Sequence, residues 1–189
     1  MARVPLITQK DELPSEYHAA FDLITQSRGQ VAGPFSVLLH SPEVAKRIAH
    51  LGTYVRFESA LSGEQRELAI LATARAMDCR YEWAAHVPLA KKAGVRGEAI
   101  AAIRDKRAPA GLTPAETEIV QYATALLRVH RVSDAVYEAL RARFGTQALV
   151  ELTATAGYYA MIACALNAFA VAISWRVPSA FLVIASSRS

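Results

Sequence analysis

Two carboxylates, a thiol and an imidazole occur close together in an Ala-rich stretch of the sequence, as Glu67, Cys79, Glu82 and His86. Spacings of three and four residues put Cys79, Glu82 and His86 on one face of a helix. Histidine titrates near neutral pH, and adjacent carboxylates tune its affinity for a proton. The stretch therefore predicts proton-transfer chemistry at His86, with Glu67 and Glu82 orienting the ring.

The position of Glu67 depends on where the helix breaks. Glu67 precedes Cys79 by twelve residues, so in an unbroken helix it projects near the same side. A break near Asp78 would let the chain fold back and still bring Glu67 close. A buried carboxylate must be paired or neutralised, so the alternative is an ion pair between Glu67 and an arginine. The candidate partners are Arg56, Arg66 and Arg75.

Cys79 has two interpretations. In the first turn of a new helix, the helix dipole would lower the pKa of its thiol and make it reactive. A free cysteine is also often a small buried apolar residue. Because Cys79 and Cys164 do not make a disulfide framework, and the N-terminal segment lacks the apolar run of a secretory signal, we expect a reducing, cytoplasmic location.

Several other side chains are candidates for a pocket wall around this cluster. They are Tyr81, Trp83, His40, Tyr158, Tyr159 and Asn167. Metal binding is not expected, because Glu82 and His86 alone supply two ligands and no His-x-x-x-His motif occurs. Glycine-rich nucleotide loops are also missing from the sequence, so no cofactor is expected.

The elements that must position these residues are helical nearly throughout. Ala and Leu recur at spacings of three and four, and strand-like alternation is scarce. Ser62–Gln65 and Thr113–Glu116 fit the capping box, whereas Gly29, Gly94 and Gly145 mark helix ends. The expected helices cover residues 14–28, 42–58, 63–77, 79–93, 96–104, 114–130, 134–143 and 147–174.

Residues 152–174 contain no charged side chain and are long enough to span a membrane. Polar side chains such as Thr153, Thr155 and Asn167 interrupt this stretch, and the rest of the chain is patterned as amphipathic helices. We therefore favour a buried central or subunit-interface helix over a membrane span. The apolar tail, residues 175–189, is expected to pack on the body or on a partner subunit.

An internal repeat is also visible. Residues 61–68 resemble residues 145–152 in their turn, in the spacing to a glutamate and in the Ala-rich helix that follows. Glu151 thus corresponds to Glu67, but Ala170 stands where the first copy has His86. Either only the first copy keeps the chemistry, or two Ala-rich helices are alike by composition.

Length and composition limit the number of domains and the classes of binding partner that we expect. At 189 residues with 53% hydrophobic residues, we expect one domain, 1–189, with its core at about 30–174. The net charge of +4 is spread along the chain without a basic, aromatic-rich run, so nucleic-acid binding is not expected. A mild basic excess suits a small anionic substrate, although a solvated surface explains it as well.

The chain resembles the carboxymuconolactone decarboxylase family, which includes alkylhydroperoxidase D. The resemblance rests on residues 66–69, on the Cys79-to-His86 segment and on 93–100, and extends more weakly over most of 30–170. It implies an all-α fold with two related helical units, assembled as a homo-oligomer, a trimer or hexamer, with active sites near the subunit contacts.

Redox members of the family carry a second cysteine three residues after the first, with a glutamate twelve residues upstream. Mapped onto this chain, these are Cys79 and Glu67, but Glu82 holds the second cysteine position. The local disulfide therefore cannot form, and the decarboxylase branch, which has Glu with His, is the better match.

The expected function is decarboxylation, or lactone hydrolysis or isomerisation, of a small anionic organic acid by cofactor-independent acid/base catalysis. One alternative is a thiol peroxidase that uses Cys79. Another is a non-catalytic helical oligomer that binds a ligand.

Overall fold

The structure is a computed structural model that describes residues 1–173. Within that range the chain forms helices and no strand, which confirms the all-α prediction. The α-helices are α1 (His18–Arg28), α2 (Pro34–Leu38), α3 (Pro42–Thr53), α4 (Gly63–Ala76), α5 (Arg80–Lys92), α6 (Gly97–Arg104), α7 (Pro114–Arg128) and α8 (Asp134–Ala168). Shorter turns are η1 (Lys10–Glu12), η2 (Ser15–Tyr17) and the π-helical η3 (Tyr54–Glu58).

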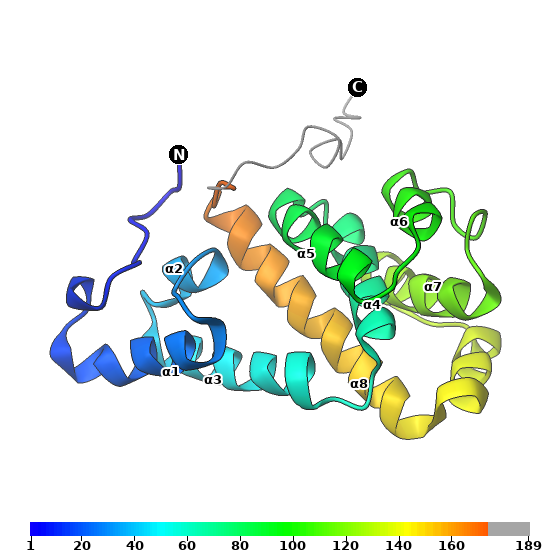
Figure 1. Cartoon of the computed structure of the whole chain (residues 1–189), viewed down its shortest axis with the longest axis horizontal. Coiled ribbons are helices and arrows are strands. Elements are labelled where there is room, and N and C mark those ends of the chain that lie inside the picture. The colour runs from blue at the N-terminus through cyan, green and yellow to red at the C-terminus, as the bar shows by residue number, and fades with distance from the viewer. Residues whose placement is uncertain (174–189) are drawn as a thin grey trace.

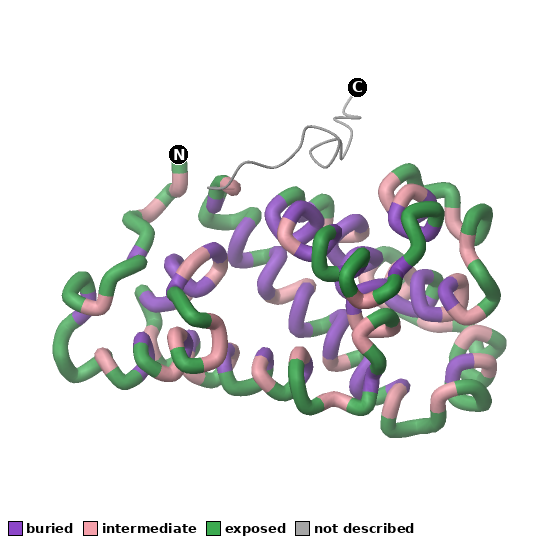
Figure 2. The backbone as a smooth tube through the Cα atoms, in the orientation of Figure 1, coloured by how far each residue is buried: buried purple, intermediate pink, exposed green. Residues whose placement is uncertain are grey.

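Helix α8 runs diagonally through the molecule, between α1–α3 on one side and α4–α7 on the other (Figure 1). Buried residues concentrate on α8, α4 and α5 (Figure 2). The strongly apolar part of α8 is long enough to cross a membrane, but 61% of it is buried inside the protein. The lack of charge over this stretch is therefore explained by its place in the core.

The predicted capping residues start the helices that hold the core. The Ser62 hydroxyl accepts from the backbone N–H of Gln65, and the Gln65 side chain accepts from the N–H of Ser62. Thr113 and Glu116 make the same reciprocal pair at the start of α7. Each pair satisfies backbone donors that have no partner within the helix.

The long helix α8 is two helices joined at Gly145. This glycine has a φ of 81°, a left-handed conformation that side chains rarely adopt, so the chain bends there without losing the helix that follows. The predicted helix boundary at Gly145 is confirmed.

Two predicted helix boundaries were wrong, and one short helix was not predicted. The helix expected from residue 14 begins at His18, after two short turns, and α2 was not expected at all. The helix expected to reach residue 174 ends at Ala168, because Ala170 is left-handed and the N–H of Val171 donates to the carbonyl of Leu166, a helix-terminating turn. The apolar tail, 175–189, lies outside the described residues.

Candidate active site

A break at Asp78 creates the site. Asp78 has a φ of 47°, and the N–H of Cys79 donates to the carbonyl of Ala74 across the turn. Aspartate tolerates this left-handed conformation better than most residues, and its carboxylate also pairs with Arg75. The chain folds back here, and α5 packs against α4 as the second arm of a hairpin.

The hairpin brings together the three residues that were predicted to be catalytic. Glu67 on α4 lies 2.8 Å from Nδ1 of His86, and Glu82 on α5 lies 3.3 Å from Nε2 of the same ring. All three side chains are buried. Of the two placements considered for Glu67, the fold-back is the one observed. The buried partner of Glu67 is His86 and not an arginine.

The two carboxylates determine the charge of the imidazole. Burial by itself would lower the pKa of His86, but the hydrogen bonds to Glu67 and Glu82 outweigh it and raise the pKa to about 9. At neutral pH His86 is therefore protonated and both ring nitrogens carry a proton. The carboxylates lie at opposite nitrogens, so the three groups do not converge on one point as metal ligands would.

One side of the cluster opens to a cavity of about 190 Å3, which we call the His86 cavity. His86 and Glu82 line it, whereas Glu67 lies behind the ring. The edge of the His86 ring meets Tyr159, with ring centroids 4.9 Å apart. The other lining residues are Arg28, Gln30, Ala32, Pro34, Phe35, Arg56, Tyr158, Tyr159 and Ile162.

Two arginines, Arg28 and Arg56, line this cavity together with Glu82 and His86. Within residues 1–173, neither forms an ion pair with a carboxylate. Arg28 lies over the Phe35 ring at 4.3 Å and donates to the carbonyl of Ala49. Burial lowers its pKa, and this effect is partly offset by Tyr158. A half-buried cation without a counter-ion favours binding of an anion in the cavity.

Gly52 on α3 makes room for the Arg28–Tyr158 pair. A Cβ at this position would lie 2.2 Å from the Tyr158 hydroxyl and 2.6 Å from Nη2 of Arg28. Any side chain at Gly52 would push both groups toward the cavity or away from each other. The glycine is thus required by a close approach.

The structure argues against a reactive Cys79. The side chain is fully buried at the N-cap of α5. Burial is the largest effect on its pKa and raises it to about 12, so the thiol stays protonated at neutral pH. Cys164, on an exposed part of α8, is also a free thiol.

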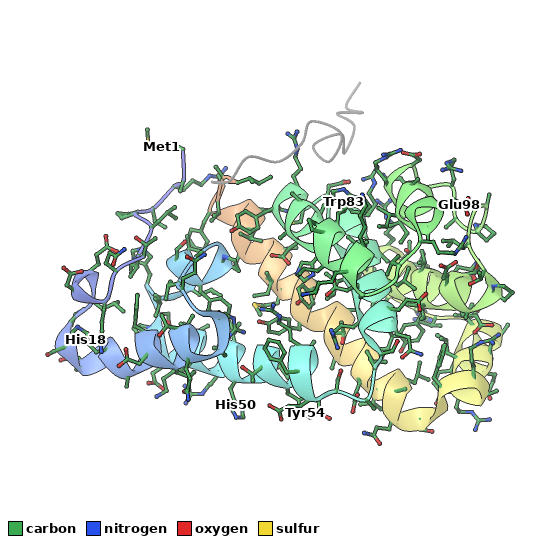
Figure 3. The ribbon with its side chains drawn as sticks, in the orientation of Figure 1. Met1, His18, His50, Tyr54, Trp83 and Glu98 are labelled. Carbon is green, nitrogen blue, oxygen red and sulfur yellow. The ribbon has the colours of Figure 1, made fainter. Side chains whose placement is uncertain are left out.

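Of the residues predicted to line a pocket, Tyr158 and Tyr159 line the His86 cavity. Trp83, labelled in Figure 3, belongs to the core cluster that includes Ile103 of α6. Tyr81 is buried against Gly33. Neither residue lines the His86 cavity.

His40 and Asn167 also lie outside the His86 cavity and have structural partners. His40 is exposed and its Nε2 lies 2.8 Å from the carbonyl of Pro5. Asn167 donates to the carbonyl of Met77, near the end of α4. The lining residues that sequence reasoning missed as pocket candidates are Arg28, Arg56 and Phe35. Only Arg56 had been considered, as an ion-pair partner of Glu67, because nothing local marks a distant arginine as facing the site.

Comparison with known proteins connects this geometry to a family. Residues 42–125 match the model of the carboxymuconolactone decarboxylase family. No functionally curated protein matches the chain.

Solved structures share the fold over nearly the whole chain. A peroxidase-related protein from Ralstonia eutropha JMP134, described as an alkylhydroperoxidase AhpD core, has a TM-score of 0.74 at 19% identity and covers 96% of this chain and 95% of its own. The debrominase Bmp8 also has a TM-score of 0.74, at 16% identity, with 96% and 98% covered. A peroxidase-related protein from Silicibacter sp. TM1040 has a TM-score of 0.71 at 18% identity, with 96% and 94% covered.

At these identities the likeness establishes the fold and not the activity. The resemblance found in the sequence is nevertheless confirmed: residues 42–125 match the model of the carboxymuconolactone decarboxylase family, and the helices of the chain have the alkylhydroperoxidase D-like fold.

Proposed function

We propose that this chain is a cofactor-independent acid/base enzyme that decarboxylates a small organic anion, with His86 as the proton donor. The observation that carries the proposal is the position of His86. Its Nδ1 is held by Glu67, and its Nε2 lies beside Glu82 at the wall of a cavity that two arginines also line. A buried imidazolium with one nitrogen toward a cavity is a suitable general acid.

The charges around the cavity favour an anionic substrate. Arg28, Arg56 and protonated His86 outnumber Glu82 among the lining residues. The aromatic rings of Phe35, Tyr158 and Tyr159 supply flat apolar walls. These features support a substrate that carries an anionic group on an unsaturated or cyclic carbon skeleton.

The proposed substrate is a β,γ-unsaturated carboxylic acid. The bond to the carboxylate carbon breaks, CO2 leaves, and the bonding electron pair shifts into the conjugated system. The Nε2 proton of His86 is transferred to the terminal carbon of that system. Neutral His86 then regains a proton from solvent by way of Glu82. The arginines hold a second anionic group that is not lost.

The same groups would serve lactone hydrolysis or double-bond isomerisation, which also move a proton to or from the substrate. Fold alone does not separate these reactions, since a debrominase shares the fold. The decarboxylation step differs from both by releasing CO2.

The test is His86→Ala, assayed with carboxymuconolactone by CO2 release. Removal of the general acid is expected to lower the rate by at least about 100-fold. Circular dichroism and size-exclusion chromatography should show unchanged helicity and oligomeric state. Turnover that survives in a folded His86→Ala protein would contradict the assignment.

The role of the arginines has its own test. Arg28→Gln should raise KM about tenfold or more with a smaller change in kcat, because it removes a charge that binds ground state and transition state alike. Arg47→Gln is the matched control, since Arg47 is exposed and pairs with Glu43 outside the cavity. An unchanged KM in Arg28→Gln would argue against substrate binding at this arginine.

Peroxide treatment distinguishes the acid/base proposal from the thiol peroxidase alternative. In a Cys164→Ser background only Cys79 can react. We expect its thiol to survive brief peroxide exposure, because the thiolate is the reactive species and burial disfavours it. Rapid loss of the Cys79 thiol, with turnover of peroxide, would favour the redox function.

A further inference from the structure

A second cavity lies among α4, α6, α7 and the loop that follows α6. Its volume is about 200 Å3, similar to that of the His86 cavity, and the two share no lining residue. We call it the Arg128 cavity. It is lined by the apolar side chains of Ala72, Ile103 and Val120, among others, and by three cations.

The cations come from three separate elements. Arg75 lies in the last turn of α4, Lys106 in the loop after α6, and Arg128 at the end of α7. No carboxylate lines the cavity. This lining differs from that of the His86 cavity, where Glu82 offsets part of the positive charge.

Two of these three charges are unbalanced. The Arg75 side chain is 10% exposed and is neutralised by Asp78, and its Nε donates to the carbonyl of Arg104. By contrast, neither the Lys106 nor the Arg128 head group forms an ion pair or a side-chain hydrogen bond within residues 1–173. Cations that converge on an apolar cavity without an acid create a local excess of positive potential.

We propose that the Arg128 cavity binds a small organic anion, namely an aromatic or short aliphatic carboxylate. The apolar lining would take the hydrocarbon body, and Lys106 and Arg128 would bind the carboxylate. An apolar cavity of about 150 Å3 is known to hold one benzene ring, so about 200 Å3 leaves room for a ring with its carboxylate at the rim. This proposal is independent of the function of the His86 cavity.

Isoleucine methyl NMR tests the site directly, because each cavity contains one isoleucine. Ile103 lines the Arg128 cavity and Ile162 lines the His86 cavity. Benzoate is the probe, with inorganic phosphate and benzyl alcohol as controls for the charge alone and the ring alone. We expect the Ile103 methyl to shift saturably with millimolar benzoate and much less with either control. The response of Ile162 reports separately on binding at the proposed active site.

Variants of exposed residues then assign the charge. The double substitution Lys106→Gln with Arg128→Gln should weaken the affinity reported by Ile103 about tenfold or more. Lys92→Gln is the matched control, being an exposed lysine on α5 outside the cavity. Thr124→Phe, which fills the cavity from α7, should abolish the Ile103 response.

An Ile103 methyl that does not respond to benzoate would overturn the proposal. Equal affinity in the wild-type protein and the Lys106→Gln, Arg128→Gln protein would also overturn it. A response to phosphate as strong as that to benzoate would identify a simple surface anion site instead, and would contradict the role of the apolar lining.

Discussion

Glu67 and Glu151 stand at corresponding places in two segments of similar sequence, 61–68 and 145–152, and both are buried to the same extent, with 6% of each residue exposed. Their partners differ. Glu67 faces an ionisable ring, His86. Glu151 accepts hydrogen bonds from neutral donors: the Tyr54 hydroxyl, the backbone N–H of Ala60 and the Gln147 amide. The first carboxylate can take part in proton transfer, whereas the second holds the 54–60 segment against α8.

The difference arises from where each helix stops. After Glu67 the chain breaks at Asp78, eleven residues later, and folds back so that His86 lies beside Glu67. The residue eleven positions after Glu151 is Ile162, which lies within α8, six residues before its end at Ala168. A β-branched residue such as Ile162 does not adopt the left-handed conformation readily. The chain accordingly continues as α8 past this position. Within residues 1–173, no helix follows α8 to place a histidine beside Glu151.

The two glutamates also show that the hydrogen-bond partners of a buried carboxylate decide whether its role is structural or chemical. For Glu151, burial would raise the pKa, but the hydrogen bonds from Gln147, Tyr54 and Ala60 lower it. It is thus a fixed anion with neutral donors around it. The hydrogen-bond partner of Glu67 is instead His86, a titratable ring whose pKa is raised to about 9. Fixed anions stabilise a fold, and titratable partners support chemistry.

The largest effect should separate the two glutamates by activity. Glu67→Gln removes the carboxylate charge that orients the His86 ring and keeps it protonated. We expect kcat/KM to fall about 1000-fold, equal to about 4 kcal/mol. The alkaline limb of the pH–rate profile should move to lower pH as well, which a merely structural defect would not cause. Glu151→Gln is the control and should keep its activity per folded molecule. Comparable losses in both variants would end the distinction.

Stability should respond to pH at opposite ends of the scale. The folded-state pKa of His86 is raised from 6.5 to about 9, so its stabilisation is complete below pH 6.5 and is lost as pH rises through 9. The loss should be about 3 kcal/mol by chemical denaturation, and His86→Gln should remove this alkaline slope. The pKa of Glu151 is lowered from 4.5, so its contribution disappears only as the solution becomes acidic. An alkaline slope that persists in His86→Gln would show that another group is responsible.

Glu151→Gln should cost stability where it spares activity. Loss of the charge weakens three hydrogen bonds to a buried carboxylate, and we expect about 2 kcal/mol from urea denaturation at pH 7. A stability equal to that of the wild-type protein would mean that the 54–60 segment is held by other contacts.

The smallest effect is expected for Tyr54→Phe, which removes one of the three donors to Glu151. Tyr54 lies at the end of α3 and is partly exposed (Figure 3). Water can replace its hydroxyl at the carboxylate, so the melting temperature should fall by less than in Glu151→Gln. A larger fall than in Glu151→Gln would place the main stabilising contact at the tyrosine.

The sequence by itself determined most of the helices and one half of the Glu67–Glu82–His86 cluster. Capping pairs such as Ser62–Gln65 and the turn at Gly145 depend on residues that are close in the chain, and local backbone physics fixes them. Glu82 and His86 belong to the same class, because a separation of four residues on a helix brings two side chains together whatever the rest of the fold does.

Only the tertiary structure decided the rest of the site. Glu67 reaches His86 because α4 and α5 form a hairpin, and Arg28 and Arg56 reach the cavity because the α1–α3 group lies across α8 from that hairpin. Cys79 became an inert core residue for the same reason, since packing around the hairpin buries its thiol completely. Contacts between distant segments depend on how whole faces pack, and no local spacing in the sequence encodes them.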